Sequence, residues 1–218
     1  GFSVAAANFY AGRLITPGTL VAVFLATSDE ALPILVSQPG ALPDLLLLLG
    51  VKLVSGAVFG VLTDLIWKRL PHRTPEHPFE ELCKDCDCEH HGIFRAALTH
   101  TVRIALFLLL VNLVLGGAIH LVGEERISQV LLSGSVLQPF VAALIGFIPN
   151  CASSVILTEL YLSGSLSFGA AVAGLCTGAG VGLAVLFKYN RHLKENLLLA
   201  GILYGSAVAT GLVCGLLF

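Results

Sequence analysis

The sequence predicts an all-α polytopic membrane protein, built as an inverted-repeat, transporter-like helical bundle with broken or re-entrant helices. Its 218 residues are 56% hydrophobic and only 12% charged, whereas a soluble domain carries about 25% charged residues. The mean hydropathy is +0.90. Eleven of the 26 charged residues fall between Lys68 and Arg95, so the rest of the chain consists of long apolar runs. This composition excludes a soluble globular protein, a disordered chain and a coiled coil.

Membrane-spanning segments follow from the length of these apolar runs, because a helix that crosses the hydrocarbon core needs about 20 apolar residues. We predict spans at Leu14–Val36, Leu42–Ile66, Ile93–Val122, Leu166–Phe187 and Leu197–Phe218. A further segment, Val130–Gly164, is longer and is interrupted at Pro149 and Asn150, which indicates two half-helices or a re-entrant hairpin. Gly1–Gly12 is about half a span and has the length of one arm of a similar broken element.

The chain divides into three parts: residues 1–67 as the end of a first transmembrane repeat, residues 68–92 as a Cys/His-rich loop, and residues 93–218 as a second repeat. The basic residues place Arg13, the 68–92 loop and Lys188–Glu195 on the cytoplasmic side, because basic loops stay inside. Pro39–Pro43 and Gly123–Arg126 then lie outside. We expect a multi-pass protein of the cell inner (plasma) membrane, and a fragment that lacks N-terminal spans, because the chain opens inside an apolar stretch without Met.

An internal repeat relates the two ends of the chain. A shift of 151 residues aligns positions 1–67 with positions 152–218 without a gap, and 16 of the 67 pairs are identical. The counterpart of Arg13 is Gly164, which must lie outside if Lys188–Glu195 lies inside. The two copies then have opposite topology, which is a recurring architecture of secondary transporters.

The strongest candidate site lies in the first predicted span, where polar residues occur at membrane depth. An ionised carboxylate at the bilayer centre costs about 3 kcal/mol, so Asp29 and Glu30 are expected to bind a cation, with Thr27 and Ser28 beside them. The repeat counterpart is a glycine-rich stretch that follows Thr177 and is an equally poor helix former. Paired interruptions at matching positions indicate a transport site. Alternatively, the carboxylates face headgroups or pair with basic residues; Lys52 and Asp64 are expected to snorkel or to pair structurally.

A second polar set lies at the other predicted break. Asn150 and Cys151 interrupt the helix, and Glu159 follows as the repeat counterpart of Asn8. Oxygen ligands favour hard or borderline cations such as Mn²⁺, whereas a thiolate favours soft ions. We therefore expect Asn8 and Glu159 to complete an oxygen-rich site and Cys151 to admit softer ions; a small buried hydrophobic role is the alternative for Cys151.

The loop between the two repeats carries a dense set of metal-ligating side chains. A C-x-x-C-x-C pattern is followed directly by two histidines, and the ligands are Cys83, Cys86, Cys88, His90 and His91. Thiolate and imidazole ligands at this density suit Zn²⁺ or another thiophilic metal. A reducing cytoplasm favours metal over disulfide, and a flexible polar linker is the alternative. Such a loop would load or sense metal, and the protein itself requires no cofactor.

Several stretches resemble the ten-transmembrane heavy-metal exporter family, whose members are labelled arsenic efflux proteins or manganese transporters. The most specific are ATSDEALPIL and IPNCASSV followed by TELYLSG, and HTVRIALFLLLVNLVL, LKENLLLAGILYG and the His/Cys-rich loop are similar too. The resemblance covers nearly all of the chain. It implies a protein of five plus five spans, of which this chain is about the C-terminal two thirds.

We therefore predict a membrane permease that exports a divalent metal or metalloid ion in a reaction coupled to protons. Its partners are the transported ion, protons and the lipid bilayer, and the protein either acts alone or forms a homo-oligomer. Burial of two carboxylates close together favours a protonated form, which supplies a proton switch. An organic-anion permease and a metal-sensing membrane subunit are the alternatives. The chain carries no H-E-x-x-H or G-x-S-x-G pattern, so an enzyme is not expected. A net charge of −2 argues against nucleic acid as a partner.

Overall fold

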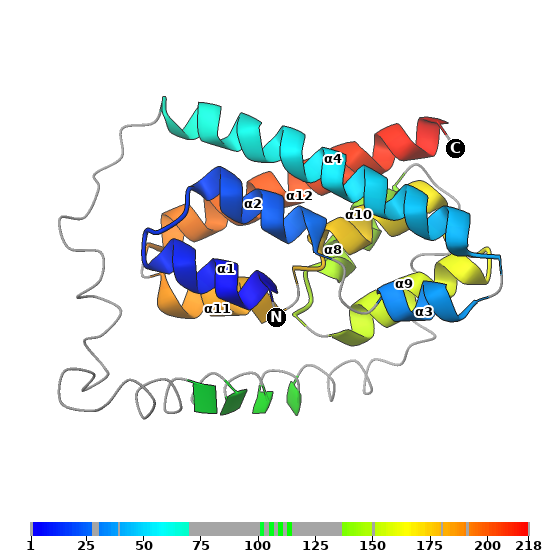
Figure 1. Ribbon diagram of the computed structural model, residues 1–218, viewed down its shortest axis with the longest axis horizontal. Helices are drawn as coiled ribbons and strands as arrows, with labels where there is room; N and C mark the ends of the chain where they lie inside the picture. Colours follow the sequence, from blue (N-terminus) through cyan, green and yellow to red (C-terminus); the bar gives the residue numbers. More distant parts are fainter. Residues whose placement is uncertain are drawn as a thin grey trace.

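The fold is an assembly of α-helices, seen in a computed structural model of the chain (Figure 1). The structure describes residues 2–27, 31–38, 40–69, 101–102, 105–106, 109–110, 113–114, 137–149, 151–179, 181–190 and 192–217. The helices within these ranges are α1 (Phe2–Ala11), α2 (Pro17–Ala26), α3 (Ala31–Ser37), α4 (Leu42–Trp67), α8 (Gln138–Gly146), α9 (Cys151–Leu162), α10 (Phe168–Thr177), α11 (Val181–Tyr189) and α12 (Leu193–Leu217).

The chain is an all-α polytopic membrane protein, as the sequence predicts. Four segments of the described chain are long and apolar enough to cross a membrane. Two of them, α4 and α12, are continuous helices. The other two are Pro17–Ser37, made of α2 and α3, and Phe168–Tyr189, made of α10 and α11. The predicted spans Leu14–Val36 and Leu166–Phe187 thus each consist of two short helices.

The third predicted interruption is also present, because α8 ends at Gly146 and α9 begins at Cys151. The segment 130–164 therefore contains two half-helices around residues 147–150, of which 147–149 are described. The predicted span Ile93–Val122 and the 68–92 loop lie outside the described residues, apart from Lys68 and Arg69 and four residue pairs between 101 and 114.

The helix bounds repeat with the same 151-residue shift as the sequence. α2 and α10 begin at positions 17 and 168 and end at 26 and 177, and α4 and α12 begin at 42 and 193. Both first half-helices have the same kind of N-cap: the hydroxyl of Thr16 accepts a bond from the Thr19 amide, and that of Ser167 accepts one from the Ala170 amide. Such caps satisfy amide groups that a helix start leaves unpaired.

Small residues hold each capped half-helix against its long helix. α2 packs on α4, and α10 packs on α12. A Cβ on Gly60 would lie 2.9 Å from the Ala22 Cβ, and a Cβ on the repeat counterpart Gly211 would lie 2.6 Å from the Ala173 Cβ. Helices in lipid associate through such close backbone approach rather than through the hydrophobic effect. Glycine at both positions therefore fixes the two equivalent helix pairs.

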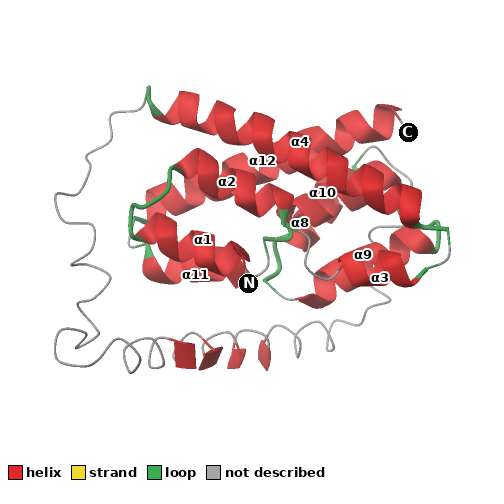
Figure 2. Cartoon of the chain, in the orientation of Figure 1, coloured by secondary structure: helices red, strands yellow, loops and turns green. Residues whose placement is uncertain are grey.

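Four of the remaining half-helices pair across the repeats. α1 packs on α11, and α3 packs on α9, so each pair takes one member from each repeat (Figure 1). Ser3 on α1 lies against Gly182 on α11, where a Cβ would lie 2.7 Å from the Ser3 Cβ. α4 and α12 lie along one side of the molecule (Figure 2), and the sequence colours in Figure 1 show that they run in opposite directions. The broken helices thus interlock the two repeats.

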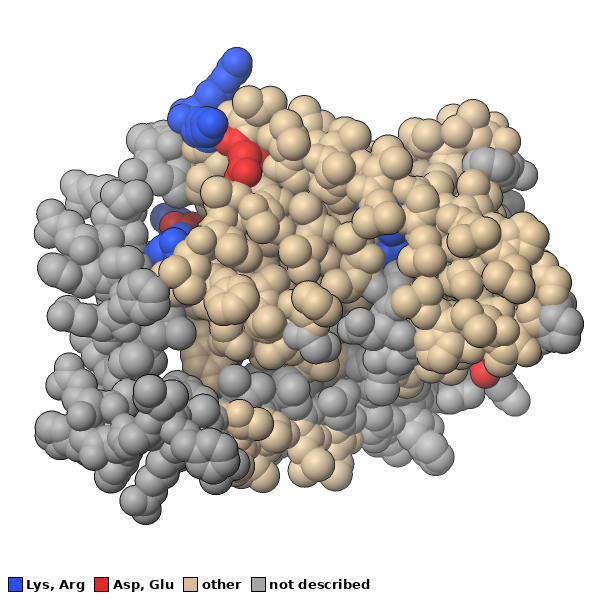
Figure 3. Space-filling view, viewed as in Figure 1, with Lys and Arg blue, Asp and Glu red and all other residues tan. Residues whose placement is uncertain are grey.

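Three parts of the described chain that are predicted to be cytoplasmic lie at the same end of the molecule. They are the turn after α1, the end of α4 and the start of α12, and basic side chains gather at this end in Figure 3. Arg13 forms a 2.9 Å ion pair with Glu195, and the Tyr10 hydroxyl lies 3.5 Å from the same carboxylate oxygen. These contacts join the first repeat to the start of α12.

The outer faces of the long helices are apolar. On α4 the exposed large side chains include Leu46, Leu53, Val54, Val58, Val61 and Leu65, and an apolar groove of about 510 Å³ separates this helix from α12. A soluble monomer rarely exposes a continuous apolar surface of this kind. Lipid chains accommodate it, because they require no hydrogen bonds from the helix surface.

Candidate functional site: the junction of the interrupted helices

Two helix interruptions define the candidate site. α2 ends at Ala26 with Thr27 as its C-cap, and α10 ends at Thr177 with Gly178 as its C-cap. The two C-caps are related by the 151-residue repeat. Thr27 has extended backbone angles (φ −71°, ψ 136°), so the helix cannot continue through it. Each interruption leaves carbonyl groups without helical partners and places the negative end of a helix dipole inside the membrane region.

Lys52 lies between these two helix ends. Its side chain projects from the middle of α4 and is fully buried, with 0% exposure. Its ammonium nitrogen Nζ donates to the Thr27 carbonyl oxygen at 2.7 Å and to the Leu175 carbonyl oxygen at 2.5 Å. One acceptor belongs to the end of α2 and the other to the last turn of α10. A buried charge requires partners of this kind, and helix C-termini favour cations.

The thiol of Cys176 lies beside this ammonium group. Cys176 follows Leu175 on α10 and is fully buried, close to the Lys52 ammonium group and the Ser55 hydroxyl. The Ser55 hydroxyl donates to the Lys52 carbonyl oxygen at 3.1 Å within α4. The junction of α2, α4 and α10 therefore brings together an ammonium group, a thiol, a hydroxyl and two backbone carbonyls in a buried position.

Thr177 connects the junction to the half-helix α8. Its hydroxyl is buried and donates to the Ala143 carbonyl oxygen at 2.7 Å, with Gly174 O at 3.0 Å in its own helix. A Cβ on Gly146 would collide with this hydroxyl and with the Gly174 backbone. Close packing at Gly146 thus places the end of α8 against the end of α10.

The predicted site residues fall into three groups. Thr27 and Thr177 lie at the two helix ends, where Thr27 contributes its carbonyl while its hydroxyl donates to the Phe24 carbonyl at 3.1 Å. Asn8 is half-buried on α1, whereas Glu159 is exposed on α9. The remainder lie outside the described residues: Ser28, Asp29, Glu30, Asn150, the side chain of Cys151, and the loop ligands Cys83, Cys86, Cys88, His90 and His91.

Asp64 has the structural role that the sequence predicts for it. Its carboxylate accepts bonds from the Thr16 hydroxyl and the Gly18 amide, both at 2.8 Å. These donors belong to the N-terminus of α2, where a negative charge is favourable. Lys52 also pairs, but its partners are the carbonyls at the interrupted helix ends, which makes it part of the candidate site. The sequence feature that could have indicated this role is a lysine in the middle of the apolar helix α4, at a position where the repeat counterpart is Leu203.

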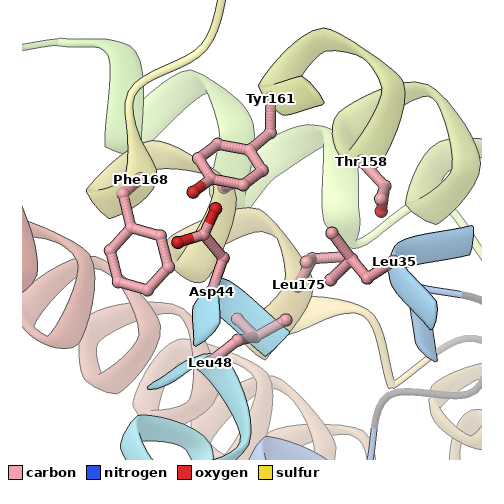
Figure 4. A pocket seen from close by; sticks show the side chains of 8 residues that line it. Leu35, Asp44, Leu48, Thr158, Tyr161, Phe168 and Leu175 are labelled. Atoms are coloured by element: carbon pink, nitrogen blue, oxygen red, sulfur yellow. The ribbon is translucent and has the colours of Figure 1, made fainter. Parts of the chain in front are cut away.

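A small cavity lies between the candidate site and the end of the molecule opposite to Arg13 (Figure 4). Its volume of about 10 Å³ is close to the minimum for one water molecule. The Tyr161 hydroxyl points to the Asp44 carboxylate at one side of it (Figure 4). Leu175, whose carbonyl accepts from Lys52, forms another part of the lining.

The chemistry available at the junction is cation binding by oxygen. Among the described residues, His, Cys, Asp and Glu side chains do not form a group of three that could hold a metal ion. Carbonyl oxygens at two helix ends are instead the available ligands, and non-helical backbone at membrane depth occurs in proteins where it lines a cavity or is buried in protein.

Comparison with known proteins identifies the family. No curated protein and no solved structure matches the chain. The family model described as "Putative, 10TM heavy-metal exporter" matches residues 102–217, a region that includes the half-helices α8–α11 and the long helix α12. The predicted resemblance is thus confirmed, and the chain belongs to this family of ten-transmembrane heavy-metal exporters.

Proposed function

We propose that the protein is a permease that exports a divalent metal or metalloid cation across the cell inner membrane in exchange for protons. The observation that carries this proposal is the meeting of two interrupted helices, from two halves of the chain, at the buried Lys52. Paired discontinuous helices of this kind are the pattern of transporter sites. Membership of a heavy-metal exporter family supports a metal as the substrate.

The substrate site proposed here combines backbone and acidic ligands. The Thr27 and Leu175 carbonyl oxygens are within reach of a cation, as Lys52 demonstrates. Asp29 and Glu30 follow Thr27 in the sequence by two and three residues. Carboxylate and carbonyl oxygens suit hard or borderline cations, and acidic groups in membrane segments commonly mark ion pathways. Asp29 and Glu30 are therefore proposed to bind the cation, with Ser28 beside them.

The repeat suggests how one site could open to both sides. Helix bounds repeat at a 151-residue interval, and α4 and α12 run in opposite directions. We take this arrangement as an inverted repeat, in which one half rocks against the other around a central site. The interlocked pairs α1–α11 and α3–α9 would then form the contact surface along which the two halves move.

The test is metal export by cells that express the intact protein. Asp29→Asn and Glu30→Gln should each lower metal resistance and raise cellular metal content, because each removes a proposed anionic ligand. Glu124→Gln, in the predicted 123–126 loop, is the matched control and should behave as the wild type. Wild-type resistance and metal content in both Asp29→Asn and Glu30→Gln would contradict the proposed site.

The 68–92 loop is proposed to bind Zn²⁺ or another thiophilic metal and to load the transporter. Replacing Cys83, Cys86 and Cys88 together with serine should lower the metal content of the purified protein, measured by elemental analysis. Metal export should persist at a reduced rate, because the loop is not the membrane pathway. Complete loss of the response to metal with intact folding would instead favour a metal-sensing subunit.

A further inference from the structure

We propose that the ion pair between Arg13 and Glu195 is a latch. It keeps one end of the molecule (the latched end) closed, and the substrate cation can enter from that end only after the pair has separated. The opposite end has an acid and a tyrosine at the equivalent positions but has glycine in place of the arginine. The inference rests on the proposed function and adds to it a contact that controls entry.

The ion pair joins the two repeats directly. Arg13 lies in the turn between α1 and α2, and Glu195 lies in the first turn of α12, 182 residues further along the chain. The guanidinium nitrogen Nη2 donates to the carboxylate oxygen Oε2 at 2.9 Å, and Nη1 donates to the Tyr10 hydroxyl at 3.4 Å. Movement of one repeat away from the other at this end therefore has to break these contacts.

The surroundings of the pair make it strong enough to hold this end. Only 23% of the Arg13 side chain and 20% of the Glu195 side chain are exposed. Fully exposed ion pairs contribute little, because water and salt screen them, and the attraction grows as the surroundings become less polar. The carboxylate also lies in the first turn of α12, where the helix dipole favours a negative charge. Because both side chains still reach water, their charges can be hydrated when the pair separates.

The backbone at Arg13 indicates that this side chain is kept for its charge. Arg13 has a φ of 58°, and its repeat counterpart Gly164 has a φ of 74°. Glycine adopts this left-handed conformation without a steric cost, whereas a residue with a Cβ is disfavoured in it. Non-glycine residues in such conformations are found mainly at functional positions, where contacts offset the strain. The contacts of Arg13 that can offset it are those with Glu195 and Tyr10.

The opposite end shows the same arrangement without the arginine. Asp44 and Tyr161 are the repeat counterparts of Glu195 and Tyr10, and the Tyr161 hydroxyl points to the Asp44 carboxylate (Figure 4). Both residues line the small cavity. An added Cβ at Gly164 meets no atom within 4 Å, so packing does not exclude a larger side chain there. Separation of the repeats should therefore cost more at the latched end than at this end.

The position of the latch suits control of entry. An exporter takes up its cation from the cytoplasm, and the basic residues predict that the latched end faces the cytoplasm. In alternating access, the two ends open in turn around a central site. Separation of the ion pair is then the first step of each export cycle. Its strength sets how often the junction of the interrupted helices is open to the cytoplasm.

The first experiment measures how often the junction is open to the latched end. Cys176 is fully buried there and serves as the reporter in intact protein whose other cysteines are replaced with serine. In inside-out vesicles, Glu195→Gln should raise the rate at which a membrane-impermeant thiol reagent labels Cys176 by about tenfold, since a charge-assisted hydrogen bond is lost. Arg13→Glu should have the same effect, and Arg13→Glu combined with Glu195→Arg should restore the wild-type rate. Lys194→Gln, at an exposed position beside Glu195, is the matched control and should not change the rate.

The second experiment adds a latch at the opposite end. Gly164→Arg places an arginine where the repeat predicts contact with Asp44, on a backbone that already has the conformation of Arg13. Uptake of Mn²⁺ by inside-out vesicles, which corresponds to export, should fall by about tenfold, because the new pair holds the exit closed. Gly164→Asn suits the same φ without a positive charge and should keep the wild-type uptake. Asp44→Asn in the Gly164→Arg protein should restore it.

The outcomes separate the latch from the proposed function. If the wild type moves no Mn²⁺ and no other metal ion, the proposed function fails, and the labelling of Cys176 still reports whether the pair controls access to the junction. If the wild type transports metal but Glu195→Gln leaves the labelling rate unchanged, the latch fails alone. Labelling that rises equally in Lys194→Gln, or that the double charge reversal does not restore, would also overturn the latch. Should Glu195→Gln not fold, Gly164→Arg decides: uptake equal to that of Gly164→Asn would contradict the inference.

Discussion

The two repeats share their backbone but differ in charge, and their turns show this most clearly. The turn after α1 has Arg13 in a left-handed conformation (φ 58°), and the equivalent turn after α9 has Gly164 in the same region (φ 74°). Glu195 faces Tyr10, and its counterpart Asp44 faces Tyr161. Only the first of these turns carries a basic side chain. The two repeats therefore share the backbone geometry of this turn but differ in its side chains. The turn with Arg13 forms an ion pair, whereas the turn with Gly164 lies at the end of the molecule that has the small cavity.

The largest expected effect comes from breaking the shared backbone packing. Gly211→Leu and Gly60→Leu should each cost more than about 3 kcal/mol of unfolding free energy or prevent folding, because a side chain there collides with the partner half-helix. Added Cβ atoms would lie 2.6 Å from Ala173 and 2.9 Å from Ala22. Unfolding in mixed micelles measures the change.

The matched controls for this prediction are another pair of repeat-related glycines. Gly50 and Gly201 have no atoms within 4 Å of an added Cβ. Replacing either with leucine should leave the unfolding free energy unchanged or raise it slightly, since leucine forms helices better than glycine. Equal losses at all four glycines would show that packing between the helices is not the cause.

Loss of the acidic side chain should lower the unfolding free energy more at the ion-paired end, where it is Glu195, than at the other end, where it is Asp44. Glu195→Gln removes the negative charge that pairs with the partly buried Arg13 at 2.9 Å, and we expect a loss of about 1–2 kcal/mol. Asp44→Asn keeps a hydrogen-bond acceptor for Tyr161 and should cost less. Unfolding of the two variants side by side gives the difference. A larger loss for Asp44→Asn would reverse the comparison between the ends.

The left-handed turns give a smaller effect. Gly164→Ala should lose about 1 kcal/mol, because a Cβ is disfavoured at this φ value. Gly164→Asn should be tolerated better, since asparagine adopts this conformation more readily. The turn has open space around Gly164, so collision does not contribute. Equal stability of Gly164→Ala and the wild type would show that the turn adjusts its backbone.

The smallest expected effect concerns the tyrosine hydroxyls. Tyr161→Phe removes the hydroxyl that points to Asp44 and should cost about 0.5–1.5 kcal/mol. Tyr10→Phe should cost less than this, because Arg13 still holds Glu195 and the Tyr10 contact is long, at 3.5 Å. Thermal unfolding of both variants tests the order. A greater loss for Tyr10→Phe would indicate that its hydroxyl organises the ion pair.

Much of this fold was predictable because its signals are local. Apolar length located the long helices α4 and α12, and Pro149 marked the interruption between α8 and α9. The poor helix formers after Thr27 and Thr177 marked the ends of α2 and α10. Such features depend on a few neighbouring residues and can be read from the chain in order.

The composition of the site was harder to predict because its contacts join distant segments. The bond from Lys52 to Leu175 crosses between helices of different repeats, and neither residue has a local pattern that indicates the other. Lysine in an apolar helix commonly extends to the membrane surface. The burial of Lys52 therefore became visible only from the three-dimensional arrangement of α2, α4 and α10. Glu159 shows the converse, since its repeat relation to Asn8 did not place it in the interior.

The exchange of half-helices has a consequence for how the protein is made. α1 is synthesised well before its partner α11, because the rest of the first repeat and most of the second lie between them in the chain. Domains generally fold from the N-terminus during synthesis, but the contact between α1 and α11 can form only after the second repeat has been made. A ribosome that stalls before α11 therefore leaves α1 without this partner.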